Sequence, residues 1–249
     1  MKLGLVLSGG ASKCIAHLGV LKALFETGVR PDIIAATSGG ALFGSFVAAG
    51  KSPDEALEII MQSRMLNIFT PSKVVKGLFS SEKIEKALRA SLPVSTFEEL
   101  QIPMIVAATD MLQGKVVSFE SGDIFKPIIA SSSYPAIFEP VEINNRQLLD
   151  GGILCNLPTA LLRERCDRII GVSVGKLYAL NNIKTQRKYF FRALELAINQ
   201  SDKAHQEGVD LLLEPPDLNE YDRFDISRGK EIFAKGYLYA LKKCEDIKK

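Results

Sequence analysis

Ser38 lies in the stretch 36–40, Ala-Thr-Ser-Gly-Gly, which has the composition of a turn that exposes a serine side chain. The apolar run Pro31–Ala36 before it is typical of a buried strand, and the apolar stretch Ala41–Ala49 after it is typical of a buried helix. A strand, a sharp turn and a helix form a nucleophile elbow, which needs small neighbours and places the serine oxygen at a helix start that favours negative charge. The small neighbours here are Ala36, Gly39 and Gly40. We therefore take Ser38 as a candidate nucleophile; the alternative is a tight turn that carries a serine.

A second loop of small residues follows the first apolar run of the chain and contains Gly9, Gly10 and Ala11. Such a loop exposes backbone N–H groups at a helix N-terminus, where they can bind a phosphate or stabilise an oxyanion. The sequence matches neither GxGxxG nor GxxxxGK[ST], so the dinucleotide-binding and P-loop motifs are excluded. Lys13 either adds positive charge to this loop or is an ordinary surface lysine.

The third candidate is Asp150, which is followed by Gly151 and Gly152. An Asp-Gly pair most often marks a turn. A nucleophilic serine, however, needs a group that accepts its proton, and a carboxylate presented on a glycine-rich turn can do so if the fold brings it within hydrogen-bond reach. Only tertiary structure can join Ser38 and Asp150, because they are far apart in the sequence.

The chain has two histidines, and one of them offers a competing assignment. His205 follows Ser38 and Asp150 in the order of an α/β-hydrolase triad, in which histidine is the base. It lies in a polar helical stretch, where an exposed histidine is the commoner outcome. For His17, we expect a packed histidine in the helix beside the glycine loop.

Short apolar runs separated by helix-compatible stretches predict the elements that position these residues. This alternation predicts an α/β fold with a largely parallel sheet. The expected strands are Leu3–Leu7, Ile33–Ala36, Met104–Ala108, Ile169–Val174 and Leu211–Leu213. Capping boxes predict helix starts at Ser52–Glu55 and Thr96–Glu99, and Tyr189–His205 has the period of a surface helix docked by one face.

Composition narrows the classes of function. The 249 residues suit one large domain, and 31 Lys and Arg against 29 Asp and Glu leave a net charge of +2, which does not favour nucleic-acid binding. Four separated cysteines and two histidines suggest neither a disulfide scaffold nor a zinc site, so we expect no metal and reduced thiols. The first apolar run is too short for a membrane span and lacks a signal-peptide cleavage site, so we expect a cytoplasmic protein.

Taken together, the three motifs resemble the patatin-like phospholipases. In that family a GGG-x-[RK]-G loop forms the oxyanion hole, a GxSxG elbow carries the nucleophile, and the aspartate of a DG[GA] motif completes a Ser–Asp dyad without histidine. The resemblance extends through Ala107–Asp110, Ala130–Phe138 and Ser173–Val174, nearly the whole chain. It implies a single patatin-like domain over residues 1–249, folded as a three-layer α/β sandwich with a largely parallel central sheet. It also implies a serine acyl hydrolase for lipid esters, with no cofactor.

On the positions of this chain, the resemblance makes Ser38 the nucleophile and Asp150 the base, with the oxyanion loop at Gly9, Gly10 and Ala11. Lys13, Ala36, Gly39, Gly40, Gly151 and Gly152 are the supporting positions. Ala11, Cys14 and Ala36 stand where the family usually has glycine, so the oxyanion loop departs most from the pattern. An alanine keeps its N–H donor but is strained wherever the backbone requires a positive φ.

Two other classes of function stay open from the sequence. One is a catalytically silent lipid-binding or regulatory module of the same fold, which the loop substitutions allow. The other is a nucleotide-dependent small-molecule kinase, because Lys2–Gly10 is similar to the phosphate-binding start of such enzymes. The kinase interpretation explains neither Ser38 nor Asp150.

Residues 64–79 mix apolar and basic side chains and include Pro71 and Gly77. They form either a cap that lines an acyl-chain groove and contacts anionic lipid, or a loop packed on the core. We accordingly expect a lipid ester substrate and consider peripheral membrane contact. The lysines at the C-terminus, Lys242, Lys243, Lys248 and Lys249, are expected to end a solvated helix rather than anchor the chain to a membrane.

Overall fold

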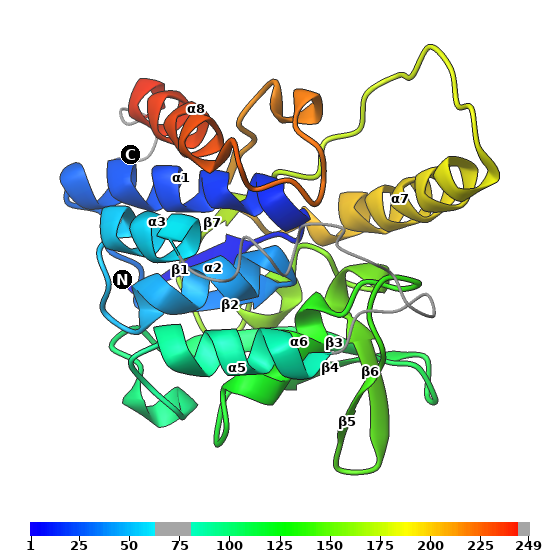
Figure 1. The fold of residues 1–249 in the computed structure, drawn as a ribbon. Coiled ribbons are helices and arrows are strands. Elements are labelled where there is room, and N and C mark those ends of the chain that lie inside the picture. Colours follow the sequence, from blue (N-terminus) through cyan, green and yellow to red (C-terminus); the bar gives the residue numbers. More distant parts are fainter. Residues whose placement is uncertain (63–80, 244–249) are drawn as a thin grey trace.

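The computed structural model describes residues 1–62 and 81–243, which form a twisted mixed sheet covered by helices (Figure 1). The strands are β1 (Leu3–Leu7), β2 (Ile33–Thr37), β3 (Met104–Asp110), β4 (Lys115–Phe119), β5 (Val141–Ile143), β6 (Arg146–Asp150), β7 (Arg168–Val172) and β8 (Leu211–Leu213). The α-helices are α1 (Ile15–Glu26), α2 (Gly39–Ala48), α3 (Pro53–Gln62), α5 (Ser81–Ser91), α6 (Phe125–Ser132), α7 (Gln186–His205) and α8 (Gly229–Lys242). The suggested cap at 64–79 and the tail lysines Lys248 and Lys249 lie outside the described residues.

The sheet has the strand order β5-β6-β3-β2-β1-β7-β8, with β4 also paired to β3. The five strands β3, β2, β1, β7 and β8 are parallel to one another. β4 and β6 each pair antiparallel to β3, and β5 pairs antiparallel to β6. The expected α/β fold with a largely parallel sheet is therefore confirmed, and the antiparallel part forms one side of it. All five expected strands are present.

The parallel strands are nearly continuous apolar runs because both of their faces are covered. Leu5, Leu7 and Ile34 face the larger core, which the helices α1, α2, α3 and α8 complete. Their neighbours Val6 and Ala35 face a smaller core on the other side of the sheet. Within the described residues this second layer is built by the segment 151–166, with the short 3-10 helices η3 (Gly151–Ile153) and η4 (Thr159–Leu161).

The hairpin of β5 and β6 was not among the expected strands. Asn144 and Asn145 form its two-residue turn with φ values of 50° and 59°. Two positive φ values in succession are the geometry of a type I′ turn, which asparagine tolerates well. The strands themselves are short and half-exposed, so they lack the apolar run that marks a buried strand.

Helix starts follow the capping chemistry to different extents. At α3, the backbone N–H of Ser52 donates to the Glu55 carboxylate and the N–H of Glu55 donates to the Ser52 hydroxyl, which is the predicted capping box. The second box, at Thr96 and Glu99, is also present but starts only the 3-10 turn η2 (Phe97–Glu99). The predicted surface helix at Tyr189–His205 is confirmed as α7. No helix in the two described stretches has the length and apolar character that a membrane crossing requires.

Candidate active site

Ser38 occupies a strained turn between β2 and α2. Its backbone has φ 54° and ψ −129°, a combination that few residues with a side chain adopt. A Cβ on Gly39 would lie 2.8 Å from the Ala11 carbonyl oxygen, and one on Gly40 would lie 2.5 Å from that of Ser8. These two positions accept only glycine because α2 starts directly against the end of β1 and the glycine loop that follows it. Ala36, by contrast, is a buried residue inside β2 with no positive φ, so this position does not need glycine.

Asp150 reaches Ser38 because β6 runs antiparallel to β3. β3 extends past the end of β2, and β6 starts at its far end and runs back. As a result Asp150 pairs with Ala108, while Thr37, the residue before Ser38, pairs with Ala107. The Ser38 hydroxyl donates a hydrogen bond of 2.6 Å to Oδ2 of Asp150. The two side chains that the sequence proposed are thus in direct contact, although 112 residues separate them.

Hydrogen bonds fix both partners of this pair. The N–H of Gly152 donates to Oδ1 of Asp150 at 2.8 Å, so each carboxylate oxygen has one donor. The N–H of Ser38 donates at 2.7 Å to the hydroxyl of Ser131, which in turn donates at 2.6 Å to the carbonyl of Ala107. Ser131 therefore links α6, the elbow and β3. This arrangement holds the Ser38 hydroxyl toward a carboxylate that cannot rotate freely.

Burial changes the acidity of Asp150. Only 4% of the residue is exposed, and loss of hydration raises its pKa to about 6. The hydrogen bonds from Ser38 and Gly152 and the positive charge of Arg223 act in the opposite direction but do not cancel this effect. A carboxylate with an ordinary pKa is a weak base at neutral pH, so the raised pKa makes Asp150 a stronger proton acceptor that is still ionised at pH 7.

The glycine loop runs beside this pair, and its three residues differ in what their N–H groups do. The N–H of Gly9 donates to the carbonyl of Asn156 at 3.1 Å, so it is not free to bind an oxyanion. No hydrogen bond within the described part of the chain uses the N–H of Gly10 or Ala11. Ala11 has a φ of 53°, so its backbone is in the left-handed region, where an alanine is strained.

Cys14 and Lys13 end the loop in the 3-10 helix η1 (Ala11–Cys14). Cys14 is fully buried, its thiol contacts the Ser8 carbonyl, and burial raises its pKa well above the ordinary value, so it is a small packing residue, not a reactive one. Lys13 is partly buried and lines the pocket described below; loss of hydration and the neighbouring Arg223 lower its pKa. It is therefore part of the site rather than an ordinary surface lysine.

A pocket of about 590 Å³ opens above Ser38 and Asp150. Its apolar wall includes Leu42, Phe43, Tyr134, Phe138, Val174, Leu177 and Ile198. Its basic side chains are Lys13, Lys176, Lys188, Arg192 and Arg223. Acidic side chains line it as well, namely Glu195, Glu220 and Asp222 beside Asp150. A cavity of this size, with both apolar and basic side chains in its lining, suits a ligand with a hydrocarbon chain and an anionic group.

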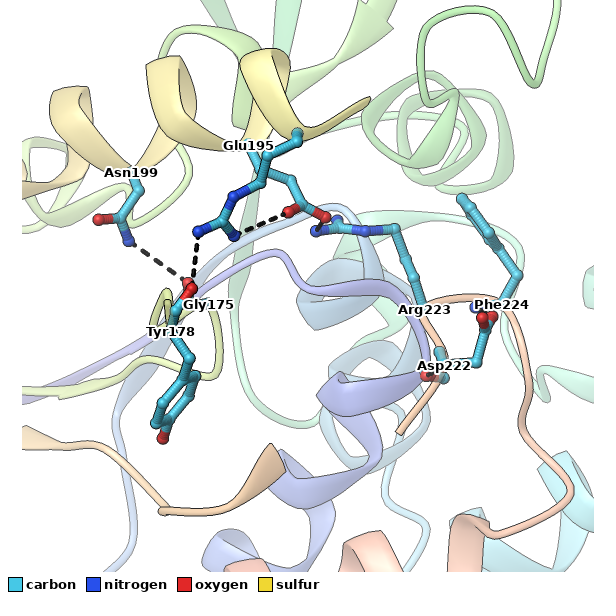
Figure 2. A network of polar contacts seen from close by, with 9 residues as sticks. Gly175, Tyr178, Glu195, Asn199, Asp222, Arg223 and Phe224 are labelled. Atoms are coloured by element: carbon cyan, nitrogen blue, oxygen red, sulfur yellow. Dashed lines mark hydrogen bonds and ion pairs between the residues drawn. The ribbon is translucent and has the colours of Figure 1, made fainter. Parts of the chain in front are cut away.

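One wall of the pocket is held by polar side chains of α7 (Figure 2). Glu195 accepts a hydrogen bond of 2.6 Å from Arg223 and also pairs with Arg192. Arg192 and Asn199 donate to the carbonyl oxygens of Tyr178 and Gly175. These contacts join α7 to the loop after β7 and to the 221–226 loop.

Neither histidine is needed to explain the Ser38–Asp150 contact, which is direct. His17 is fully buried in α1, one ring nitrogen lies 2.9 Å from the Ser8 carbonyl oxygen, and burial lowers its pKa to about 4, as expected for a packed, neutral histidine. His205 ends α7, and the position of its side chain is outside what the structure describes. Because the Ser38 hydroxyl bonds directly to Asp150, the geometry does not favour a triad in which histidine separates them.

The fold and the site thus define an α/β protein with a serine on an elbow and an aspartate as its direct partner. The family model described as patatin-like phospholipase matches residues 5–163. This chain therefore belongs to the patatin-like phospholipase family.

Relatives agree with this assignment, and a solved structure shares the fold. An uncharacterized NTE family protein of Mycobacterium tuberculosis is 36% identical over 177 residues, which cover 70% of this chain and 49% of that protein. Lysophospholipase NTE1 of Kluyveromyces lactis is 26% identical over 272 residues, covering 95% of this chain and 19% of that protein. The crystal structure of VipD from Legionella pneumophila has a TM-score of 0.67 at 14% identity, covering 98% of this chain and 67% of that one, and shares the fold. The chain spans about half the length, or less, of these relatives.

Several residues of the site were not predicted from the sequence, among them Ser131, Tyr134 and Arg223. Ser131 lies in a run of three serines, and nothing in the run marks the one that binds the elbow. Tyr134 lies in the stretch 130–138 that shares the family resemblance, but nothing there marks it as a pocket residue, and Arg223 reaches the pocket from a segment that carries no motif. Only the contacts of the folded chain identify them.

Proposed function

We propose that this protein is a serine acyl hydrolase that cleaves fatty-acyl esters of lysophospholipids, phospholipids or related lipids. The observation that carries the proposal is the 2.6 Å hydrogen bond between the Ser38 hydroxyl and Asp150 at the base of a partly apolar pocket. The names of the fungal relatives, lysophospholipases, are consistent with a lipid ester as substrate.

In the proposed reaction, Asp150 accepts the proton of Ser38 as its oxygen attacks the ester carbonyl. The N–H groups of Gly10 and Ala11 donate to the oxyanion of the tetrahedral intermediate, while Gly9 shapes the loop through its bond to Asn156. The intermediate collapses to an acyl-enzyme, and the leaving alcohol takes the proton from Asp150. Water then attacks the acyl-enzyme, gives its proton to Asp150 and releases the fatty acid, and Asp150 returns the proton to Ser38. The whole reaction needs no reactant besides the ester and water.

The pocket lining supports a lipid with an anionic headgroup. The acyl chain would pack on the apolar wall near Leu42 and Phe138, and a phosphate group would lie toward Arg223 and Lys13. Lys13 has no ion-pair partner among the described residues, so an anionic ligand would provide one. The silent lipid-binding module is the second candidate, and the strained Ala11 is the observation that favours it.

Labelling with a fluorophosphonate probe tests the proposal. The full chain should gain one adduct that peptide mapping places on Ser38, and Ser38→Ala should gain none. Ser45→Ala is the matched control, because Ser45 lies on α2, the helix that follows Ser38, with its hydroxyl bonded to the Leu42 carbonyl, and it does not line the pocket.

Turnover of a panel of lysophospholipids and phospholipids should fall at least about 10³-fold in Ser38→Ala and Asp150→Asn. Ser45→Ala should keep the wild-type rate. A folded wild-type protein that neither reacts with the probe nor hydrolyses any ester would reject the hydrolase and favour the binding module.

A further inference from the structure

Helix α7 divides its side chains among three faces. Lys188, Arg192, Glu195 and Asn199 recur at helical spacing and line the pocket. Phe191, Leu194 and Ile198 pack on the core cluster that includes Tyr134. The third face carries Tyr189, Phe190, Ala193, Leu196 and Ala197, all of them exposed. We call this third face the outer stripe.

The outer stripe is apolar although it faces away from the protein. Tyr189 and Phe190 are each 52% exposed and Leu196 is 50% exposed. The five residues of the outer stripe are one, three or four residues apart, which places them on one side of the helix, where a water-facing helix normally carries charges. Figure 1 shows α7 at the edge of the molecule, with its N-terminal end pointing outward from the sheet.

The segment that leads into this helix is strongly basic. Residues 168–194 contain no Asp or Glu, and from residue 175 onward they include Lys176, Lys184, Arg187, Lys188 and Arg192. The whole chain has a net charge of only +2, so positive charge is concentrated here. Of these five, only Arg192 forms an ion pair within the described part of the chain, with Glu195. An apolar stripe flanked by unpaired cations is the pattern of a helix that lies in the interface of an anionic membrane.

The same region borders the pocket. Leu180 lines the pocket and is also 56% exposed, so it lies where the pocket meets the solvent. Lys176 and Lys188 line the pocket from the loop and from the helix. A lipid that leaves a bilayer beside the outer stripe would therefore pass these residues on its way to Ser38.

We propose that the outer stripe of α7, together with the basic segment before it, docks this protein on the surface of an anionic phospholipid bilayer. The choice of a bilayer as the partner rests on the proposed function, since the substrate would be supplied from it. Charge complementarity favours a bilayer over a second copy of the chain, because two copies would bring their basic segments together.

Vesicle co-sedimentation of the full chain carrying Ser38→Ala tests this proposal without turnover. The protein should bind vesicles of phosphatidylcholine with about 30% phosphatidylserine, and binding should fall with salt and on vesicles of phosphatidylcholine alone. Phe190→Gln with Leu196→Gln should weaken binding at least about tenfold, and Lys184→Gln about fivefold. Leu238→Gln is the matched control: this residue is 56% exposed on α8, and its loss should leave binding unchanged.

Three results would overturn the proposal: wild-type affinity of the Phe190 and Leu196 double variant, equal loss with Leu238→Gln, or a wild-type dimer that only the double variant dissociates. Circular dichroism should first show that each variant keeps its helix content. In the active protein, the double variant should hydrolyse a water-soluble short-chain ester at the wild-type rate but lose turnover on vesicles. If the active protein hydrolyses no ester, the proposed function fails while the binding result still decides the docking surface.

Discussion

At the scale of single residues, the site contains two features that destabilise the fold. Asp150 carries a charge where hydration is lost, and Ser38 and Ala11 have positive φ values of 54° and 53°. Strain and buried charge concentrate at functional sites because function requires a geometry that stability alone would not select. A substitution that removes the buried charge or the strain should therefore stabilise the protein, and it should not raise the activity.

Asp150→Asn should stabilise the protein at neutral pH. The pKa of Asp150 is about 6 in the folded protein and near the ordinary value of 3.8 in the unfolded chain, so the folded state binds the proton more tightly. Folding therefore bears the full penalty of the charge above about pH 6, and this penalty fades as the pH falls toward 4. The difference between these two pKa values corresponds to about 3 kcal/mol at most.

Urea unfolding at pH 7.5 and pH 4.5 measures this difference. The asparagine can still accept from the Gly152 N–H with its oxygen and donate to Ser38 with its amide. The variant should be more stable than wild type by up to about 3 kcal/mol at pH 7.5, and by only about 1 kcal/mol at pH 4.5. A stability difference that is independent of pH would show that burial of the charge is not its cause.

Ala11→Gly should also stabilise the protein, by up to about 1 kcal/mol. An L-residue in the left-handed region is strained by about 1–2 kcal/mol, and the greater freedom of glycine in the unfolded chain offsets part of the gain. The melting temperature should rise by a few degrees. The matched opposite is Gly122→Ala, where φ is 74° and no atom lies within 4 Å of the added Cβ, so that strain alone should destabilise it by about 1 kcal/mol. A destabilised Ala11→Gly would contradict the strain at this position.

At the scale of elements, the contact between α1 and α8 depends on two glycines. A Cβ on Gly236 would lie 2.1 Å from the Ala16 carbonyl oxygen, and a Cβ on Gly19 would lie 2.0 Å from that of Phe233. Because both obstacles are backbone atoms, neither helix can accommodate a side chain without moving away from the other.

Gly236→Ala should therefore lower the free energy of unfolding by about 3 kcal/mol, although alanine has the higher helix propensity. Leu238→Ala is the control on the same helix: this side chain is exposed, and its loss should change stability by no more than about 0.5 kcal/mol. Thermal unfolding of the two variants compares them directly. A Gly236→Ala protein as stable as wild type would mean that the helices are not in close contact at this point.

The elements that the sequence predicted well are those with a strong local pattern. The parallel strands β1, β2 and β3 are continuous apolar runs, and α7 has a clear helical period. The antiparallel strand β6 was not predicted, because Arg146–Leu149 is short and only half-buried. This strand nevertheless brings Asp150 to Ser38. The two residues of the pair could therefore be predicted from the sequence, but their contact could be seen only in the folded chain.

The same limit applies to the oxyanion loop. The sequence places Gly9, Gly10 and Ala11 together, but only the fold shows that the N–H of Gly9 already donates to Asn156. Partners such as Ser131 and Arg223 depend on long-range contacts, for which no local pattern exists.

At the scale of the whole molecule, the electrostatics of the site are set from segments distant in sequence. Ser12, in the glycine loop, donates through its N–H and its hydroxyl to the carbonyls of Arg223 and Asp222, which fixes the 221–226 loop to the N-terminal part of the chain. Glu195 of α7 then holds the Arg223 side chain (Figure 2). The positive charge of Arg223 is close enough to lower the pKa of Asp150.

Arg223→Gln should therefore raise the pKa of Asp150 further. The base must be ionised, so the kcat/KM for a water-soluble ester should fall below about pH 6 in the wild type, where Asp150 takes up a proton. In the variant this acid limb should move to higher pH, because the ionised carboxylate has lost a favourable charge. A pH profile of kcat/KM between pH 4.5 and 8.5 measures the shift.

Two controls separate the charge from the contacts it makes. Glu195→Gln breaks the same ion pair but keeps the charge of Arg223, so its acid limb should not move to higher pH. Arg228→Gln removes a positive charge further along the chain, where Arg228 pairs with Glu231 and lies over Tyr221, and its profile should match the wild type. If Glu195→Gln and Arg223→Gln raise the limb equally, the effect comes from the loosened wall of the pocket. If only Arg223→Gln raises it, the helix, the loop and the sheet together set the basicity of one carboxylate through a single charge.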